Sequence, residues 1–417
     1  MTAKKFSIAM VAACPFPANY GSPASIREMS ETLAGFGHNV HIVTYPHGDD
    51  LPVGGAHIHR VEPTGGDHQV RVGPSSDKPV LDWRLLRLLV RVIREHDIQV
   101  IHAHNYEAAL IGLAAKVITG KPLLYNAVNT MVDELPGYGF IKPAFVARGL
   151  AKALDWFVPL FPDHITAVSE LLLAGLIQQG VSPDRATYVP AGILPEMFDN
   201  ADAGKFRRHY NLGSRKVVMY TGTLGAFQRM ENLFNAYRVV AREEPSAVLM
   251  VVDSIPEPAL IEKYKAMANA LGYADKVIWV EQHPLGDLPH YLASADATVV
   301  PRPDCPGHPV KLLNYMIAAR PIVAFAGGAK GLTDRHDALV VPDGDCEAMG
   351  QAIVKLLRDS EFANRLGANA RRTVLSQFDW RLLCRKIEVI YEGLVEHAGR
   401  VDREVCRNGV RMDKSVQ

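Results

Sequence analysis

The sequence predicts an α/β protein of two successive domains, each with a doubly wound parallel sheet, which face each other across a central cleft. Three observations support this prediction. The chain has 417 residues, which exceeds the usual size of one hydrophobic core and indicates two domains of about 200 residues each. Short apolar runs of strand length alternate with helical patterns. This alternation stops at the turn-rich segment 189–200 and then begins again.

The first domain is expected to span residues 1–195. Its predicted strands are short apolar runs at 6–12, 39–44, 57–61, 99–103, 122–126 and 164–168. Apolar residues recur at helical spacing between them, at 24–36, 82–96, 107–118, 145–157 and 170–179. Because strands alternate with helices, we expect neighbouring strands to be parallel.

The second domain is expected to span residues 196–379 and repeats the same pattern. Its predicted strands lie at 217–222, 247–253, 276–280, 297–302 and 321–325. Its predicted helices lie at 230–243, 259–271, 286–294, 310–318, 345–358 and 360–376. A last helix is expected at 380–397, and residues 398–417 are polar enough to predict a flexible tail.

Composition excludes several classes of protein. Lys plus Arg and Asp plus Glu each number 45, so the chain lacks the basic surface of a nucleic-acid-binding protein. The five cysteines are scattered, odd in number and without CxxC spacing, which favours a reducing cytoplasm and argues against a structural zinc site. We interpret the apolar run 6–13 as the first strand, with a short signal peptide as the alternative. No run approaches the roughly 20 apolar residues of a membrane span, so we expect a cytoplasmic protein.

The segment 300–323 carries the clearest functional signal. An apolar strand is followed by a loop rich in proline and glycine, and a helix begins near Val310 with Lys311 in its first turn. The N-terminus of a helix directs backbone N–H groups and a positive dipole toward one point, which suits a phosphate. The groups expected to surround this phosphate belong to Arg302, Gly307, His308, Pro309, Val310 and Lys311.

A second glycine-containing loop follows the strand at 217–222. Gly222 and Gly225 have the placement of a loop that cradles a nucleotide, although a plain tight turn explains a pair of glycines equally well. Thr223 and Arg229 belong to the same loop and are candidate contacts to that nucleotide.

In the first domain, further candidate residues lie at or after the ends of three predicted strands. Gly21 precedes a helix near Pro23, and the absence of a side chain would let a phosphate or sugar approach the backbone; a well-capped helix is the alternative. His104 ends one strand, and a buried structural histidine is the alternative to a ligand contact. The remaining candidates for ligand binding are Asn129, Asp133 and Glu134, which follow another strand.

The order and spacing of these motifs resemble glycosyltransferase family 4, the large retaining GT-B group, over roughly residues 5–397. The landmarks are Gly37-His38 before a strand, AVSE at 167–170, VPAGI at 189–193 and FDW at 378–380. The resemblance implies two Rossmann-like domains, with the acceptor in the first and the donor in the second. The candidate residues for acceptor binding are then His104, Asn129, Asp133 and Glu134. The resemblance also implies that the helix at 380–397 packs back on the first domain, with Trp380 buried at the crossing.

The sequence departs from the usual family pattern at several positions. Pro306 and Asn314 stand where the family carries two glutamates, so the chain resembles a divergent subgroup with P-x-K-l-x-x-Y, here Pro309, Lys311 and Tyr315. Arg229 stands where glycine is usual. Asn126 and Val128 replace an aspartate and a histidine, Thr223 and Gln228 replace an arginine and a lysine of many members, and Ala319-Arg320 replace Gly-Lys.

The resemblance implies transfer of a sugar from a nucleotide-activated donor to a glycan, lipid-linked or small-molecule acceptor, with retention of configuration. Neither a metal nor another cofactor is expected, because Lys311 and Arg302 would stabilise the leaving diphosphate. Asn314 would hold the nucleotide ribose, and these three are the candidate catalytic residues. Because of these substitutions, a catalytically degenerate protein that acts as a binding or partner subunit is an alternative hypothesis. A sugar-nucleotide epimerase is a second alternative.

A peripheral contact with the inner face of the membrane is a further hypothesis. Four arginines lie on one stripe of the predicted helix 82–96, namely Arg84, Arg87, Arg91 and Arg94. The apolar stretch LDWFVPLF at 154–161 is the second feature that favours membrane contact. For the helix at 82–96, the alternative is an ordinary surface helix that packs its apolar side on the sheet.

Overall fold

The computed structural model describes residues 4–18, 21–63, 78–135, 141–254, 257–281, 284–304 and 309–413. The chain forms two compact units, one of Met1–Ala191 with Trp380–Gln417 and one of Gly192–Asp379. The division between Ala191 and Gly192 lies slightly before the boundary predicted at residues 195 and 196.

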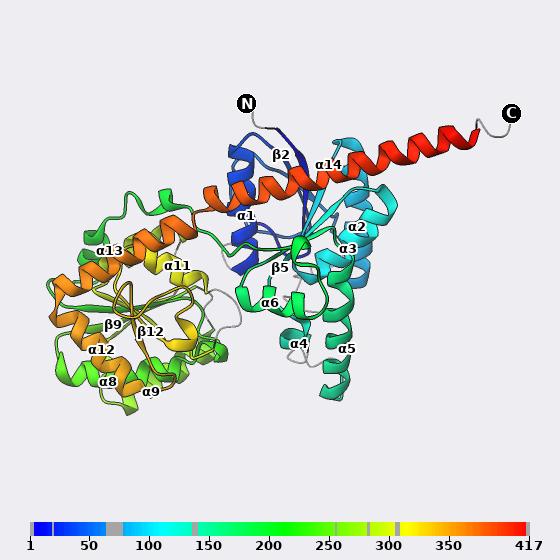
Figure 1. Ribbon diagram of the computed structural model, residues 1–417. Coiled ribbons are helices and arrows are strands. Elements are labelled where there is room, and N and C mark those ends of the chain that lie inside the picture. The colour runs from blue at the N-terminus through cyan, green and yellow to red at the C-terminus, as the bar shows by residue number, and fades with distance from the viewer. Residues whose placement is uncertain are drawn as a thin grey trace. The chain divides into compact units, whose positions relative to one another are not determined.

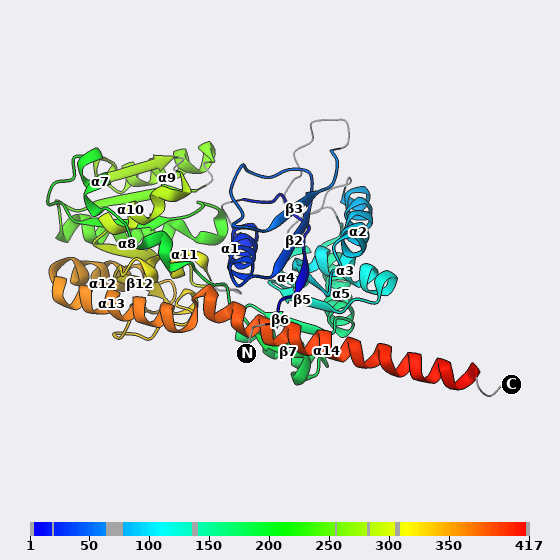
Figure 2. The ribbon, with the colours of Figure 1, turned by 90° about the horizontal axis from the view of Figure 1, so that it is seen from above.

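Unit 1 contains a parallel sheet of seven strands in the order β3-β2-β1-β4-β5-β6-β7. The strands are β1 Ser7–Ala12, β2 Asn39–Thr44, β3 His57–Arg60, β4 Val100–His104, β5 Leu123–Ala127, β6 His164–Ala167 and β7 Ala186–Tyr188. The helices are α1 Gly21–Gly35, α2 Lys78–Glu95, α3 Asn105–Thr119, α4 Met131–Glu134, α5 Ala144–Phe157, α6 Glu170–Gln178 and α14 Trp380–Asp413. Figure 2 shows α1 on one face of this sheet and α2 and α3 on the other.

Unit 2 contains a parallel sheet of six strands in the order β10-β9-β8-β11-β12-β13. The strands are β8 Val217–Thr221, β9 Val248–Asp253, β10 Val277–Glu281, β11 Ala297–Val300, β12 Ile322–Phe325 and β13 Leu339–Val341. The helices are α7 Ala203–His209, α8 Met230–Glu243, α9 Pro258–Ala270, α10 Leu288–Ser294, α11 Val310–Ile317, α12 Cys346–Arg358 and α13 Ser360–Gln377. The prediction of two doubly wound α/β sheets is therefore confirmed.

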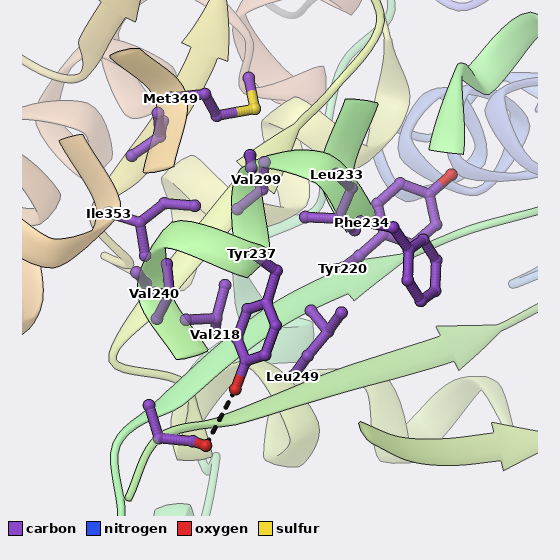
Figure 3. Close-up of a cluster of buried hydrophobic side chains, with 14 of the residues drawn as sticks. Val218, Tyr220, Leu233, Phe234, Tyr237, Val240, Leu249, Val299, Met349 and Ile353 are labelled. Atoms are coloured by element: carbon purple, nitrogen blue, oxygen red, sulfur yellow. Dashed lines mark hydrogen bonds between the residues drawn. The ribbon is translucent and has the colours of Figure 1, made fainter. Parts of the chain in front are cut away.

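The core of unit 2 lies between its sheet and the helices α8 and α12 (Figure 3). Alternate residues of the central strands point into it, because successive side chains of a strand face opposite sides of the sheet. Val218 and Tyr220 of β8 meet Leu233 and Tyr237 of α8 there, and all four are fully buried. The Tyr237 hydroxyl donates to the Ala247 carbonyl at 2.9 Å, so this core contains a satisfied polar group.

The last helix differs from its prediction in length. α14 continues to Asp413, whereas the sequence predicted a flexible tail after residue 397. Residues 398–413 are polar, but they contain no proline and many arginine, glutamate and other helix-compatible residues, so polarity alone was a poor guide. The short elements β13, α4 and α7 were also not predicted, since three to seven residues carry little periodic signal.

The first part of α14 belongs to the core of unit 1, where it packs on α1 and reaches β4 (Figure 1). Trp380 is 1% exposed, and its indole Nε1 donates to the Glu28 carboxylate at 2.8 Å. Further along the helix, the Tyr391 hydroxyl lies 2.7 Å from His102 Nδ1. Glu388 Oε1 lies 2.8 Å from His38 Nε2. The burial predicted for Trp380 is confirmed.

The buried environment of Glu28 predicts a pH-dependent stability. Burial raises the pKa of Glu28 to about 7, although the hydrogen bond from Trp380 opposes the shift. A carboxyl group with a raised pKa stabilises the fold below its unfolded pKa and loses that contribution as pH rises through its folded pKa. We therefore expect Glu28→Gln to stabilise the protein by on the order of 2 kcal/mol at pH 8 and to have little effect near pH 4.5. Thermal unfolding of both proteins across this range measures the difference, and an equal shift at the two ends would contradict it.

Among the helices that the structure describes, none is both long enough and apolar enough to span a bilayer.

Candidate functional site

The strand order of unit 2 places a ligand-binding position between β8 and β11. These strands are neighbours, and the order reverses between them. The chain leaves β8 toward α8 on one face of the sheet and leaves β11 toward α11 on the other. Ligands of doubly wound sheets bind at such a reversal, beyond the carboxyl ends of the strands.

Lys311 lies at this position, in the first turn of α11. Its ammonium group donates to the Tyr220 hydroxyl at 2.6 Å and to Gln228 Oε1 at 2.8 Å. The same nitrogen lies 4.1 Å from the centre of the Tyr220 ring, which adds a cation–π contact. Lys311 therefore links the start of α11 to the loop that follows β8.

Gly222 has two reasons to be glycine. Its φ angle is +123°, which side-chain-bearing residues rarely adopt. A Cβ atom at this position would also lie 2.9 Å from the Lys311 ammonium nitrogen. The glycine therefore leaves room for the lysine at the end of β8.

Tyr220 supports this arrangement from inside the core. Its hydroxyl donates to the Thr223 carbonyl at 2.7 Å and accepts from Lys311. Burial, reinforced by nearby Tyr315 and Asp253, raises the pKa of Tyr220 well above its usual range, while Arg302 partly opposes the shift. The phenol is therefore neutral, and it can donate and accept at the same time.

Arg302 brings a second positive charge to the same neighbourhood. It follows β11, its Nε donates to the Asp304 carbonyl at 2.8 Å, and its guanidinium lies 5.4 Å from the centre of the Phe227 ring. Phe227 comes from the loop after β8, so the two strand-end loops meet here as well. Arg302 and Lys311 thus flank the reversal point from the β11 side.

Arg229 occupies a backbone position that favours glycine. It has a φ of +53° and directly precedes α8, where no side-chain hydrogen bond caps the helix. This left-handed conformation costs an arginine about 1 kcal/mol or more relative to glycine. The conformation explains why glycine is usual at this position in the family that the sequence resembles.

Tyr315 has a positioning role in this structure. It is fully buried, and its hydroxyl accepts from the Thr221 backbone N–H at 2.8 Å, which ties α11 to the end of β8. Burial raises the pKa of Tyr315 to about 12. Earlier in the chain, Pro309 occupies the N-cap position of α11 without a side-chain hydrogen bond, and Val310 begins the helix, as predicted. Asn314 is partly exposed on the same helix. Gly307 and His308 lie outside the described residues.

Unit 1 has a corresponding reversal between β1 and β4. Gly21, at the start of α1, has a φ of +49°, which accounts for a glycine there. His104 ends β4 and is fully buried, with Nδ1 3.2 Å from the Asn126 side-chain nitrogen. Burial lowers the pKa of His104 to about 3, so its imidazole is neutral. Contact between His104 and an acceptor therefore requires its neighbours to move.

The other predicted acceptor residues lie beyond β5. Asn129 is exposed just after the strand. Asp133 and Glu134 belong to α4, but their side chains lie outside the described residues. The backbone N–H groups of Met131 and Val132 donate to Asp155 at 2.7 and 2.9 Å, so this carboxylate holds the start of α4 against α5.

Two residues of the site were not predicted, Tyr220 and Gln228. Both hold the Lys311 ammonium group. Gln228 was not among the predicted site residues, but it is only 6% exposed and its side-chain oxygen accepts from Lys311. The loop motif that contains Gln228 and the helix motif that contains Lys311 are complementary parts of one arrangement.

Comparison with known families identifies this arrangement. Residues 21–196 match the model described as Glycosyltransferase Family 4, and residues 215–359 match Glycosyl transferases group 1. The chain belongs to glycosyltransferase family 4. The second range covers the whole sheet of unit 2 of this glycosyltransferase, including the reversal between β8 and β11, and the first range covers the strands of unit 1 from β2 to β7.

Individual relatives of this family 4 protein agree with that assignment. A GDP-mannose-dependent alpha-(1-6)-phosphatidylinositol monomannoside mannosyltransferase of Mycobacterium tuberculosis is 27% identical over 326 residues, covering 76% of this chain and 80% of the relative. Sucrose-phosphate synthase from Thermosynechococcus elongatus is 19% identical with a TM-score of 0.78, over 94% of this chain and all of the other. Anabaena HepE, solved with UDP-glucose, is 16% identical with a TM-score of 0.69, over 93% and 100%. The two structures share the GT-B fold with this chain.

Proposed function

We propose that this glycosyltransferase transfers a sugar from a nucleotide-activated donor with retention of configuration and without a metal ion. The observation that carries the proposal is the Lys311 ammonium group, held by Tyr220 and Gln228 beside the side-chain-free Gly222. A fixed cation next to open backbone at a strand-order reversal suits a diphosphate.

In this proposal unit 2 binds the donor, and its cations assist departure of the nucleotide. Negative charge grows on the diphosphate as the bond to the sugar breaks, and Lys311 and Arg302 stabilise that charge. The acceptor hydroxyl attacks from the face that the diphosphate leaves, and a phosphate oxygen takes its proton. This route requires no protein nucleophile, so the replacement of the usual histidine by Val128 is compatible with turnover. Asn314 is the proposed contact to the nucleotide ribose.

A lipid-linked acceptor is the acceptor class that the surface of unit 1 favours. α5 buries only Ala147 and Ala151 among its described side chains, while Phe145 is 74% and Trp156 57% exposed. Arg148 and Lys152 are exposed on the same helix. Exposed aromatic and basic residues on one helix are typical of a surface that rests on anionic lipid. The mycobacterial relative, whose name specifies a phosphatidylinositol-based acceptor, supports the same choice.

Thermal-shift measurements with a panel of nucleotides and sugar nucleotides test the donor proposal. A ligand that binds only the folded protein at 100 times its Kd stabilises it by about 2.7 kcal/mol, so a true donor produces a clear rise in Tm. The stabilising donor is then incubated with the protein, and release of nucleotide is followed with and without anionic lipid acceptors. Absence of stabilisation by every nucleotide would contradict the donor site. Stabilisation without hydrolysis or transfer would favour the degenerate subunit instead.

A further inference from the structure

Three histidines from different elements of unit 1 bring their rings together on the sheet face that α2 covers. His41 belongs to β2, His59 to β3, and His96 follows α2 directly. One nitrogen from each ring lies within 4.8 Å of the other two. His41 stacks on His96 with ring centres 4.2 Å apart and on His59 at 5.2 Å. We call these three residues the histidine cluster.

The register of the strands explains why the cluster forms. His41 pairs with His57, and His59 is two residues further along β3. The side chains of His41, His57 and His59 therefore lie on the same face of the sheet. Val43, also on that face, belongs to the core under α2. The C-terminal end of α2 therefore brings His96 over the two strands.

One nitrogen of the cluster is buried without a hydrogen-bond partner. His41 is 3% exposed, and its Nδ1 lies 2.9 Å from His59 Nε2. Its other nitrogen, Nε2, is buried and has no hydrogen bond from any residue that the structure describes. Leaving such a group unsatisfied is costly, and a bound ion is one of the few explanations for it.

We propose that the histidine cluster binds a divalent late transition-metal ion, with Zn²⁺ as the best-suited member of the class. Neutral imidazole is a preferred ligand of Zn²⁺, Cu²⁺, Ni²⁺ and Co²⁺. Ligand nitrogens of a tetrahedral zinc site lie about 3.3 Å apart, so small rotations of the rings close the present geometry. Three protein ligands leave a fourth position for water.

The electrostatics of the cluster favour a bound cation. The C-terminal end of α2 contributes the negative end of a helix dipole, which stabilises positive charge.

The position of the cluster separates it from transfer chemistry. His41 and His59 lie within strands and His96 precedes β4, so no member of the cluster lies in the loops that follow the carboxyl ends of the strands. Ligands of doubly wound sheets bind in those loops, beyond the carboxyl ends. The proposed ion therefore lies apart from the transfer chemistry, and it ties the short edge strand β3 to β2 and α2.

Titration of the full-length, chelator-treated protein with Zn²⁺ by calorimetry tests the proposal, with Co²⁺ as a spectroscopic probe. We expect binding of a single equivalent, a rise in Tm, and the visible absorption of tetrahedral Co²⁺. His59→Gln and His96→Gln change partly exposed side chains, which limits their effect on folding. Each is expected to weaken binding by about tenfold or more, as loss of a metal-site interaction commonly does.

His397→Gln is the matched control, because this histidine is exposed on α14 and lies apart from the cluster. It should bind Zn²⁺ as the unmodified protein does. Circular dichroism and the response to sugar nucleotides verify that each variant is folded. The proposal would be overturned if the folded, unmodified protein did not bind a single equivalent of Zn²⁺. It would also be overturned if the unmodified protein and all three variants bound Zn²⁺ with equal affinity.

Discussion

Lys311→Met is expected to lower the rate of sugar transfer by about 10²–10³-fold, the usual cost of removing one group that stabilises charge in a transition state. Methionine keeps the side chain up to the position of Cε but removes the cation that Tyr220 and Gln228 hold. Because charge on the diphosphate increases as the sugar leaves, kcat should fall more than the donor KM rises. Steady-state kinetics with the donor found by thermal shift measure both constants.

Tyr220→Phe is the matched comparison for that experiment. It leaves the Lys311 charge and the ring beneath it in place but removes the hydroxyl that accepts from the ammonium group at 2.6 Å. A positioning role predicts a loss of about tenfold, much smaller than that of the lysine variant. If Lys311→Met remained within threefold of the unmodified protein and had the same Tm, Lys311 would have no part in the reaction. If activity per folded molecule were unchanged while Tm fell, its role would be structural only.

The sequence predicted the helix and strand ends around this site better than the contacts between its side chains. The proline and glycine before Val310 and the apolar run before Pro301 predicted where α11 begins and β11 ends, because both signals are local. The hydrogen bonds from Lys311 to Tyr220 and Gln228 join residues more than eighty positions apart. Neither periodicity nor capping carries information about such contacts, so these two residues were not predicted.

The histidine cluster escaped prediction for a related reason. Metal sites are recognised in sequences when several ligands fall within one short motif. His41, His59 and His96 come from two strands and the end of a helix, and only the H-x-H pair at 57–59 is local. The strand register and the path of α2 bring them together, and both depend on tertiary structure. The same limit applies to the start of α14, where Trp380 meets Glu28 across 352 positions.

Trp380→Ala is expected to destabilise unit 1 by about 3–5 kcal/mol, the usual cost of deleting a large buried aromatic side chain. Trp380 is 1% exposed at the start of α14, where that helix joins the core of unit 1. Calorimetric unfolding should resolve the effect as a lower Tm of one transition, because two units need not unfold together. A loss below about 1 kcal/mol would show that the cavity collapses or that α14 contributes little to unit 1.

Trp380→Phe separates the packing of the ring from its hydrogen bond. The smaller ring still fills much of the site, but Glu28 loses the indole N–H that partly offsets its burial. The pKa of Glu28 should then rise further, so the variant should lose more stability at pH 8 than near pH 4.5. Adding Glu28→Gln should remove most of this pH-dependent loss, because the neutral amide has no charge to bury. If the double variant kept the same pH dependence as Trp380→Phe alone, another ionisable group would be its source.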